Sequence, residues 1–224
     1  MLSEMFFKLW DKGLIQMGIW ETVYMTFISS AFAYLIGLPL GVILNITDKK
    51  GICPHPGVNS VLGLVVNFFR SIPFIILMVA MLPVAKFVVG TQLGNKAVIV
   101  MLIIAAAPYV ARMCESSLNE VNAGVIEAAQ SMGANNLEII FKVLIPEAKP
   151  ALITGASISV VTILGYSAMA GFCGGRGLGD IAVRYGYYRY EPDLMIVTLV
   201  LIVVIVQIFQ EVGMRIAKRC DKRR

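Results

Sequence analysis

Charged residues are scarce in this chain of 224 residues, since only 15% are Asp, Glu, Lys or Arg. Water-soluble domains carry about a quarter, so a soluble globular domain is a poor interpretation. In place of charge, 58% of the residues are hydrophobic, and many of them fall in long runs. Runs of about 20 apolar residues are typical of helices that cross a bilayer. The sequence therefore predicts an all-α, polytopic membrane protein.

The residues that build metal sites and catalytic clusters are also few. His55 is the one histidine, and the four cysteines (Cys53, Cys114, Cys173 and Cys220) include no C-x-x-C pair. Structural zinc sites need cysteine and histidine at such spacings, and covalent catalysis needs a nucleophile beside a base. We therefore expect no metal, no cofactor and no enzymatic activity in this chain.

A nucleotide site is not predicted either, because the chain has no G-x-x-x-x-G-K-[ST] phosphate loop. The glycine-rich run from Gly174 to Gly179 lacks the strand and helix that flank a phosphate cradle. We interpret this run as a flexible external loop. ATP-driven transport would thus require an ATPase on another chain.

Five apolar stretches are the main feature of the sequence, and we expect spans at about 23–44, 61–85, 88–111, 151–172 and 193–212. The second span carries Arg70, and the third, which we expect to take in Phe87 to Val89, contains Pro108. Proline inside a helix removes a hydrogen bond, so Pro108 is expected to kink or end its span. Residues 1–19 would form an external N-terminal segment, 20–212 the transmembrane domain and 213–224 a basic tail.

The distribution of lysine and arginine predicts the orientation. The side that carries the C-terminal segment has eleven of these residues and the opposite side has seven. Cytoplasmic loops carry the excess, so an odd number of spans places the N-terminus outside and the C-terminus in the cytoplasm. A basic tail directly after a span favours contact with anionic lipid over nucleic-acid binding.

A long segment, residues 112–149, lies on the predicted cytoplasmic side between the third and fourth spans. Leu137, Ile140, Phe141 and Leu144 recur at i, i+3, i+4 and i+7, which predicts a short amphipathic helix. Asn135 or Asn136 can cap its start, Glu138 suits its first turn, and Pro146 is expected to end it. Its apolar face could pack on the chain's own spans or lipid headgroups, or in a groove of a partner.

The same segment carries a motif. Glu127-Ala128-Ala129, then Gly133-Ala134, then Val143-Leu-Ile-Pro146 resembles the EAA loop of ABC importer permeases, in which E-A-A is followed by G after three residues and by I-x-L-P after nine more. Three further stretches, Arg70 to Leu77, Gly165 to Gly171 and Tyr185 to Tyr187, are similar to the methionine-importer branch of that family.

The resemblance implies a machine of several chains in the bacterial cytoplasmic (inner) membrane. It would contain a second copy of this permease, two cytoplasmic ABC ATPase subunits that use the ATP, and an extracytoplasmic methionine-binding lipoprotein, with no nucleic acid. Methionine would cross by alternating access. The alternative function is an ATP-independent secondary transporter or channel for a small amino acid, which would need internal repeats or carboxylates inside the spans; we find neither.

The resemblance also implies roles for individual residues. The EAA loop would couple the permease to the ATPases through Glu127, Ala128, Ala129, Gly133, Ala134, Leu137, Ile140, Phe141, Pro146 and Glu147.

The fourth span offers candidates for the pathway and its gate, because its hydroxyl groups could contact a solute and its bulky residues could close the route. These candidates are Ser159, Thr162, Tyr166, Ser167 and Met169. Ordinary helix packing is the alternative interpretation for each hydroxyl.

Overall fold

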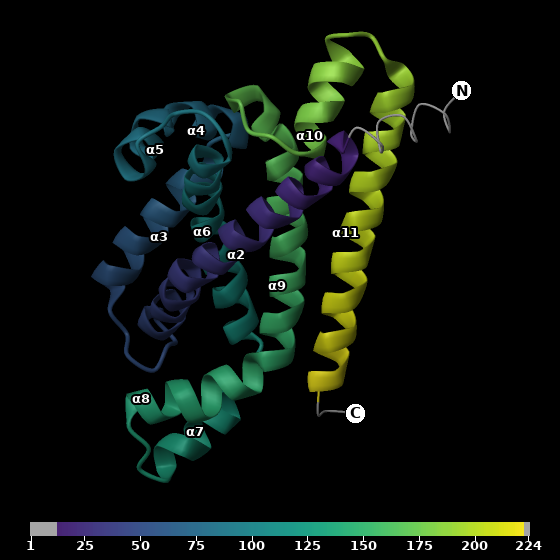
Figure 1. The fold of residues 1–224 in the computed structure, drawn as a ribbon. Coiled ribbons are helices and arrows are strands. Elements are labelled where there is room, and N and C mark those ends of the chain that lie inside the picture. The colour runs from purple at the N-terminus through teal and green to yellow at the C-terminus, as the bar shows by residue number, and fades with distance from the viewer. Residues whose placement is uncertain (1–12, 222–224) are drawn as a thin grey trace. The chain divides into compact units, whose positions relative to one another are not determined.

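The computed structural model describes residues 13–221. The regular secondary structure in this range is entirely helical (Figure 1). Four of these helices are long and apolar enough to cross a membrane, and the number rises to five if a bent helix pair counts as one span. The all-α, polytopic membrane architecture is therefore confirmed.

The helices follow one another with short connections. In chain order they are α2 (Leu14–Thr47), α3 (Pro56–Ser71), α4 (Phe74–Ala80), α5 (Leu82–Val89), α6 (Asn95–Asn119), α7 (Ala123–Ser131), α8 (Asn136–Glu138), η1 (Ile139–Leu144), α9 (Ile145–Ala168), η2 (Met169–Cys173), α10 (Leu178–Ile181), η3 (Ala182–Tyr187) and α11 (Pro192–Cys220).

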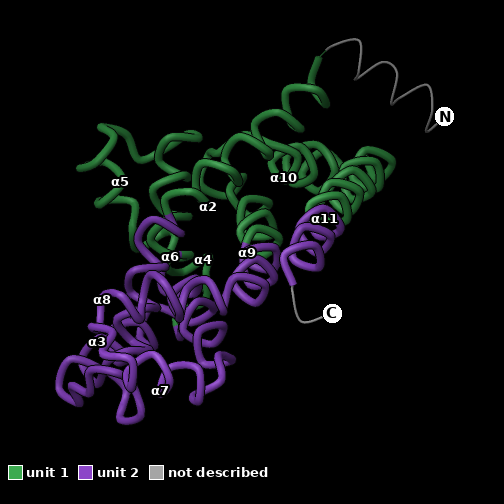
Figure 2. The backbone as a smooth tube through the Cα atoms, turned by 90° about the horizontal axis from the view of Figure 1, so that it is seen from below, with its two compact units in different colours: residues 1–32, 72–106, 160–209 green, residues 33–71, 107–159, 210–224 purple. Residues whose placement is uncertain are grey.

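The chain divides into two compact units, coloured in Figure 2. Unit 1 comprises Met1–Phe32, Ile72–Ala106 and Val160–Phe209, and unit 2 comprises Ala33–Ser71, Ala107–Ser159 and Gln210–Arg224. The helices α2, α6, α9 and α11 each contribute residues to both units.

In unit 2, α2 crosses α6 at two glycines four residues apart. A Cβ atom on Gly37 would lie 2.7 Å from Val110 Cγ1, and one on Gly41 would lie 2.6 Å from the carbonyl oxygen of Ala111. Helices in lipid gain little from hydrophobic burial against each other, so small residues that allow close backbone approach hold such crossings together. One turn beyond Gly41, Asn45 Nδ2 donates to Asn119 Oδ1 at 2.7 Å.

In unit 1, the glycine-rich run that we expected to be a flexible loop is packed against helices, so that expectation is wrong. Leu178 N–H donates to the buried Thr22 Oγ1 at 2.9 Å, and Arg176 N–H donates to Asn95 Oδ1 at 2.6 Å. Gly177 has φ +139°, a conformation that favours glycine. The glycines allow this turn to lie close against α2 and α6.

The second span is the largest departure from the predicted boundaries. No single helix covers 61–85, because α3 ends at Ser71 and α4 starts at Phe74 after a bend of 102°. The break falls at Ile72-Pro73, and a residue before proline is sterically disfavoured in the helical conformation. Arg70 lies in the last turn of α3, where a cation favours the helix dipole.

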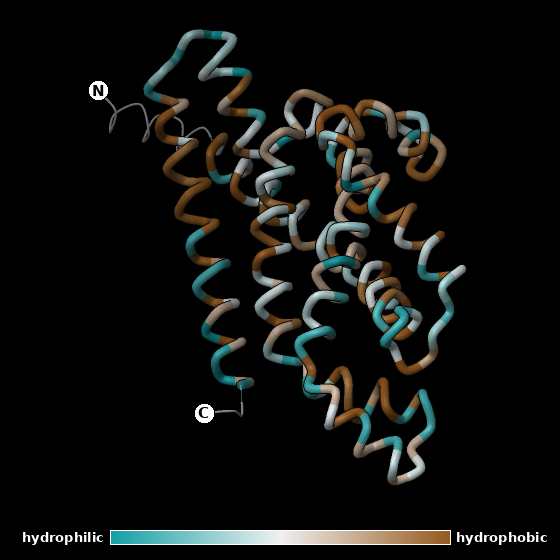
Figure 3. Tube along the Cα trace, turned by 180° about the vertical axis from the view of Figure 1, so that it is seen from behind, coloured by the Kyte–Doolittle hydropathy of each residue, from teal (hydrophilic) through white to brown (hydrophobic). Residues whose placement is uncertain are grey.

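Other boundaries differ because helices run further than their apolar cores. Phe87 to Val89 belong to α5, and α6 begins at Asn95 and continues through Pro108 without ending there. Residues 14–19 form the first turns of α2, so they are no separate segment; residues 1–12 lie outside the described range. Helix α11 likewise extends through the predicted tail to Cys220, changing from hydrophobic to hydrophilic near its end (Figure 3).

The glycine crossing predicts a stability effect. Gly41→Ala should lower the unfolding free energy of the detergent-solubilised protein by about 1–3 kcal/mol, as overpacking does, because its Cβ would meet the backbone of α6. The buried Cys114 touches the same position, so a thiol-reactive dye during a thermal ramp measures the opening. Gly57→Ala, with open space around its Cβ, is the control, and equal melting of both variants would contradict the crossing.

Candidate coupling hairpin

The segment with the E-A-A pattern forms a helical hairpin in unit 2, made of α7, α8 and η1 (Figure 1). Helix α7 starts at a cap, where Gly124 N–H donates to the Asn122 side chain at 2.8 Å. It ends at Ser131, and Gly133, whose φ is +82°, follows the cap residue Met132. There the N–H groups of Gly133 and Ala134 donate to the carbonyl groups of Gln130 and Ala129. This paired pattern is a Schellman motif, and it gives the motif glycine a backbone role.

The second arm of the hairpin begins with a capping box. Asn135 Oδ1 accepts from Glu138 N–H at 2.9 Å, and the Glu138 carboxylate accepts from Asn135 N–H at 3.1 Å. Lys142 Nζ also lies 3.0 Å from Glu138. The predicted cap is therefore confirmed at Asn135, and two reciprocal bonds fix where the arm starts.

The arm does not end at Pro146, so that expectation is wrong. Ile139–Leu144 form a π-helical turn, in which Ile145 N–H bonds to the carbonyl of Ile140, and the chain then enters α9 with Pro146 as its second residue. Proline has no N–H to donate, so the helical backbone continues through Pro146 with that one bond missing. Asn136–Cys173 consequently form one run of 38 helical residues.

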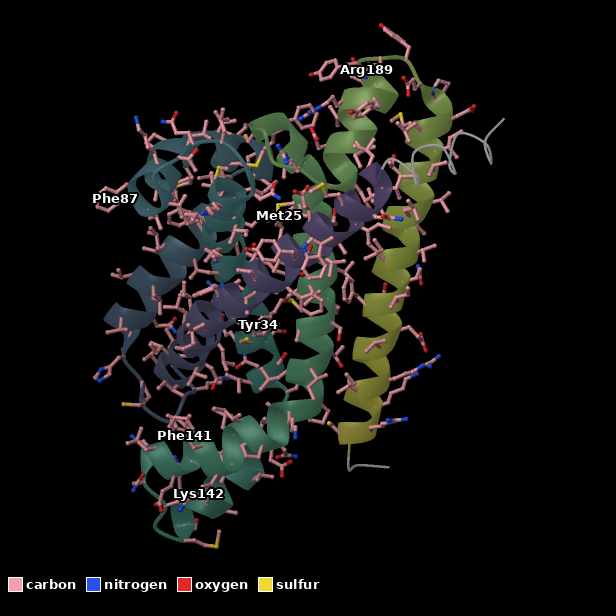
Figure 4. All side chains as sticks on the ribbon, in the orientation of Figure 1. Met25, Tyr34, Phe87, Phe141, Lys142 and Arg189 are labelled. Atoms are coloured by element: carbon pink, nitrogen blue, oxygen red, sulfur yellow. The ribbon has the colours of Figure 1, made fainter. Side chains whose placement is uncertain are left out.

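The four apolar residues of the predicted stripe divide into two pairs. Ile140 and Leu144 are buried, whereas Leu137 and Phe141 are each 67% exposed. Figure 4 shows Phe141 and Lys142 projecting from η1. The prediction missed Ile139, which is fully buried, because it assumed the spacing of an α-helix, and the wider π turn, with its i→i+5 bonding, changes which residues share a face.

Of the buried pair, Leu144 anchors the hairpin to the rest of unit 2. Leu144 packs with Ala148 of α9, with Leu118 in the last turn of α6 and with Val121 just after that helix, and Ile46 of α2 joins the cluster. Met132, beside the turn of the hairpin, is also exposed, at 82%. The hairpin thus has a packed base and an unpacked apolar tip.

The two acidic residues of the motif do not converge. Glu127 lines a cleft of about 460 Å³ together with Lys50 and Gln130. Glu147 lines another, of about 230 Å³, with Glu120 and Asp221. Of the small residues, Ala129 is buried against the hairpin's inner side, while Ala128 and Gly133 are exposed. In the described residues, no group of three or more His, Cys, Asp or Glu side chains could hold a metal.

Comparison with known proteins gives this geometry a context. Residues 37–223 match the model of a family described as the binding-protein-dependent transport system inner membrane component. The chain belongs to this family.

Individual members are similar over nearly the whole chain. The "Probable D-methionine transport system permease protein MetI" of Vibrio cholerae is 50% identical, with 95% of each chain covered. The "Methionine import system permease protein MetP" of Bacillus subtilis is 46% identical over 99% of this chain and 100% of its own. A solved structure of the MetNI methionine ABC transporter in an inward-facing conformation contains a chain that superposes with a TM-score of 0.92 and 45% identity, covering 93% and 97%.

For a transport component of this kind, the pathway candidates on α9 and η2 are of equal interest, and the structure separates them into two groups. Ser159 and Ser167 are buried, and their hydroxyl groups donate to carbonyls of their own helix at 2.8 and 2.7 Å. Tyr166 stacks on Phe74 of α4 with ring centroids 4.3 Å apart. These three side chains make contacts within the fold. Such contacts are what ordinary helix packing, the alternative interpretation of the hydroxyl groups, would produce.

The other two candidates occupy an accessible face. Met169 is 43% exposed and Thr162 is half-buried. Gly165 lies between them at helical spacing, with open space where its Cβ would be. The prediction did not include Gly165, which shares this face.

The tyrosine-rich segment before α11 lies in unit 1. The guanidinium of Arg189 stands 4.5 Å over the Tyr185 ring, while Tyr187, Tyr188 and Tyr190 are exposed. Within the preceding turn, Arg184 pairs with Asp180 at 3.0 Å; burial raises the pKa of Asp180, and Arg184 partly opposes this shift. Exposed tyrosines beside a span suit a membrane–water interface.

The capping box at the hairpin predicts a local effect. Asn135→Ala should destabilise the second arm by about 1 kcal/mol, as the loss of a cap does, and should increase hydrogen exchange of the amides in η1. Asn136→Ala, one residue into the helix, keeps both reciprocal bonds and should leave exchange unchanged. Equal exchange in the two variants would show that the box does not hold the arm.

Proposed function

We propose that this chain is the permease subunit of an ATP-driven methionine importer, which moves its cargo by alternating access. The hairpin carries the proposal: its base packs on α2 and α6 while Leu137, Phe141 and Met132 are exposed at its tip. An exposed apolar helix face fits a groove on a partner protein. The partner would be a cytoplasmic ABC ATPase, with two copies for two permease chains.

In such a complex, the hairpin would couple movements of the ATPases to the permease. ATP binding would bring the two ATPases together, and their grooves would displace the two hairpins with them. Because Leu144 and Ala148 are buried beside the ends of α2 and α6, the displacement would reach the spans. A ligand shifts an equilibrium only through different affinities for two states, so the grooves must hold the hairpin differently in each.

The first test is association with the ATPase. Phe141→Asp places a charge at the tip, and the desolvation cost should abolish co-purification of the ATPase from membranes that express both chains. Phe141→Leu keeps an apolar side chain and should retain the complex. Insertion of both variants in the membrane is the control. An unchanged complex with Phe141→Asp, or uphill uptake by the chain without an ATPase, would contradict the proposal.

The cargo requires its own test. The names of the relatives favour methionine, D-methionine among its forms, and an extracytoplasmic binding protein would deliver it. We expect cells that carry the complex to take up labelled L-methionine. Excess unlabelled L- or D-methionine should inhibit this uptake, each according to the affinity of the importer for that enantiomer. Competition by unrelated amino acids at equal strength would contradict the assignment.

We propose that the N-terminus lies outside the cytoplasmic membrane and the C-terminus inside. Two natural cysteines allow a test of this orientation. Cys53 and Cys220 are partly exposed, whereas Cys114 and Cys173 are buried. A membrane-impermeant maleimide should label Cys53 and Cys220 in inverted vesicles and not in intact cells. Lys96→Cys, on the predicted external side, should show the opposite pattern. Labelling of Cys220 in intact cells would reverse the topology.

A further inference from the structure

Helix α3 has three faces of different chemistry, all within unit 2. One is buried and includes Gly63 and Val66. A second is exposed and apolar, made of Val58, Val61, Val65 and Phe68. The third, which we call the polar face, is made of Ser60, Asn67 and Ser71, with Leu64 among them, and all four residues are exposed. Positions 60, 67 and 71 align at helical spacing.

The polar face is part of an open surface along the helix, which Asn59, Gly63 and Phe68 continue on either side. An ion pair of α6 lies at its edge: Arg112 bonds to Glu115 at 2.6 Å and donates to Asn67 Oδ1 at 3.1 Å and to the carbonyl of Gly63 at 3.4 Å. Gly63 makes room for this approach, since a Cβ there would lie 3.3 Å from the guanidinium. The Nε atom of Arg112 is buried and has no hydrogen-bond partner.

These two exposed faces cannot share one environment. The apolar face suits lipid, whereas hydroxyl, carboxamide and charged groups within a span are expensive in hydrocarbon and turn toward water or protein. Helix α3 with α4 meets the length and composition of a span only as a bent pair. The polar face is therefore the side of α3 that water reaches.

We propose that the polar face of α3, with the Arg112–Glu115 pair at its edge, lines the aqueous route of the cargo and binds a small zwitterionic amino acid in passing. This inference rests on the proposed function for the identity of the cargo. Hydroxyl and carboxamide groups bond to both an ammonium and a carboxylate. The paired charges of Arg112 and Glu115 offer both signs to a zwitterion without a net charge that would trap it.

The test compares single cysteines on the two exposed faces. In a chain whose four natural cysteines are replaced by alanine, Ser60→Cys and Ser71→Cys probe the polar face, and Val61→Cys and Val65→Cys probe the apolar face. The probe is a cationic, water-soluble methanethiosulfonate applied to membranes that contain the complex. Only the thiolate reacts, and an apolar environment raises a thiol's pKa, so we expect about tenfold faster labelling or more on the polar face.

Equal rates on both faces, or faster labelling at Val61→Cys, would overturn the aqueous route. Quantitative disulfide cross-linking of Ser60→Cys between two copies, without labelling, would also overturn it, because the face would then be packed against a second copy. With ATP present, saturating L-methionine should slow labelling at Ser60→Cys several-fold and leave Val61→Cys unchanged. Absence of this protection in a complex that imports methionine would overturn binding by this face.

The labelling experiment on α3 can fail or succeed independently of the tests of methionine import. The contrast in labelling between the two faces requires only the chain in its membrane, so it remains measurable if the complex does not import methionine. Conversely, methionine import with equal labelling on both faces would leave the importer intact and remove this inference.

Discussion

The close approach of α2 and α6 at Gly37 and Gly41 is the contact on which unit 2 depends. In lipid, the gain from pressing two helices together comes from backbone proximity and from polar bonds that have no water to compete with. The glycines supply the backbone proximity, and the exposed Asn45–Asn119 bond closes the crossing one turn further on. Asn119 is also the last residue of α6, so the hairpin departs from a fixed point.

The hairpin itself is determined by backbone chemistry more than by its apolar pattern. The Schellman motif at Gly133 and the capping box at Asn135 set the two ends of a tight connection. Side chains then divide between the base and the tip. The three residues between Ala129 and Gly133 thus have a direct physical explanation: at this spacing the turn at the glycine closes bonds to carbonyls that α7 would otherwise leave unpaired.

Much of the architecture follows from the sequence because it depends on composition and local rules. Long apolar runs gave the membrane class, and Asn135 with Glu138 gave the cap. The helix break at Ile72-Pro73 could also have been predicted, because proline restricts the conformation of the residue before it. A continuous span was predicted there instead. The site was harder to predict: the stacking of Tyr166 on Phe74 and the burial of Ser159 depend on helices distant in sequence, and the π turn carries no composition signal.

The uninterrupted backbone from Asn136 to Cys173 has a mechanical consequence. A flexible loop between the exposed tip and α9 would deform locally when the tip is displaced. A continuous helix transmits the displacement to α9. A change of bend is least costly where the regular bonding is altered, at the π turn and at Pro146 and Pro150 just after it. A small change of angle at Ile139–Leu144 would therefore change the direction in which the exposed Phe141 points relative to the start of α9.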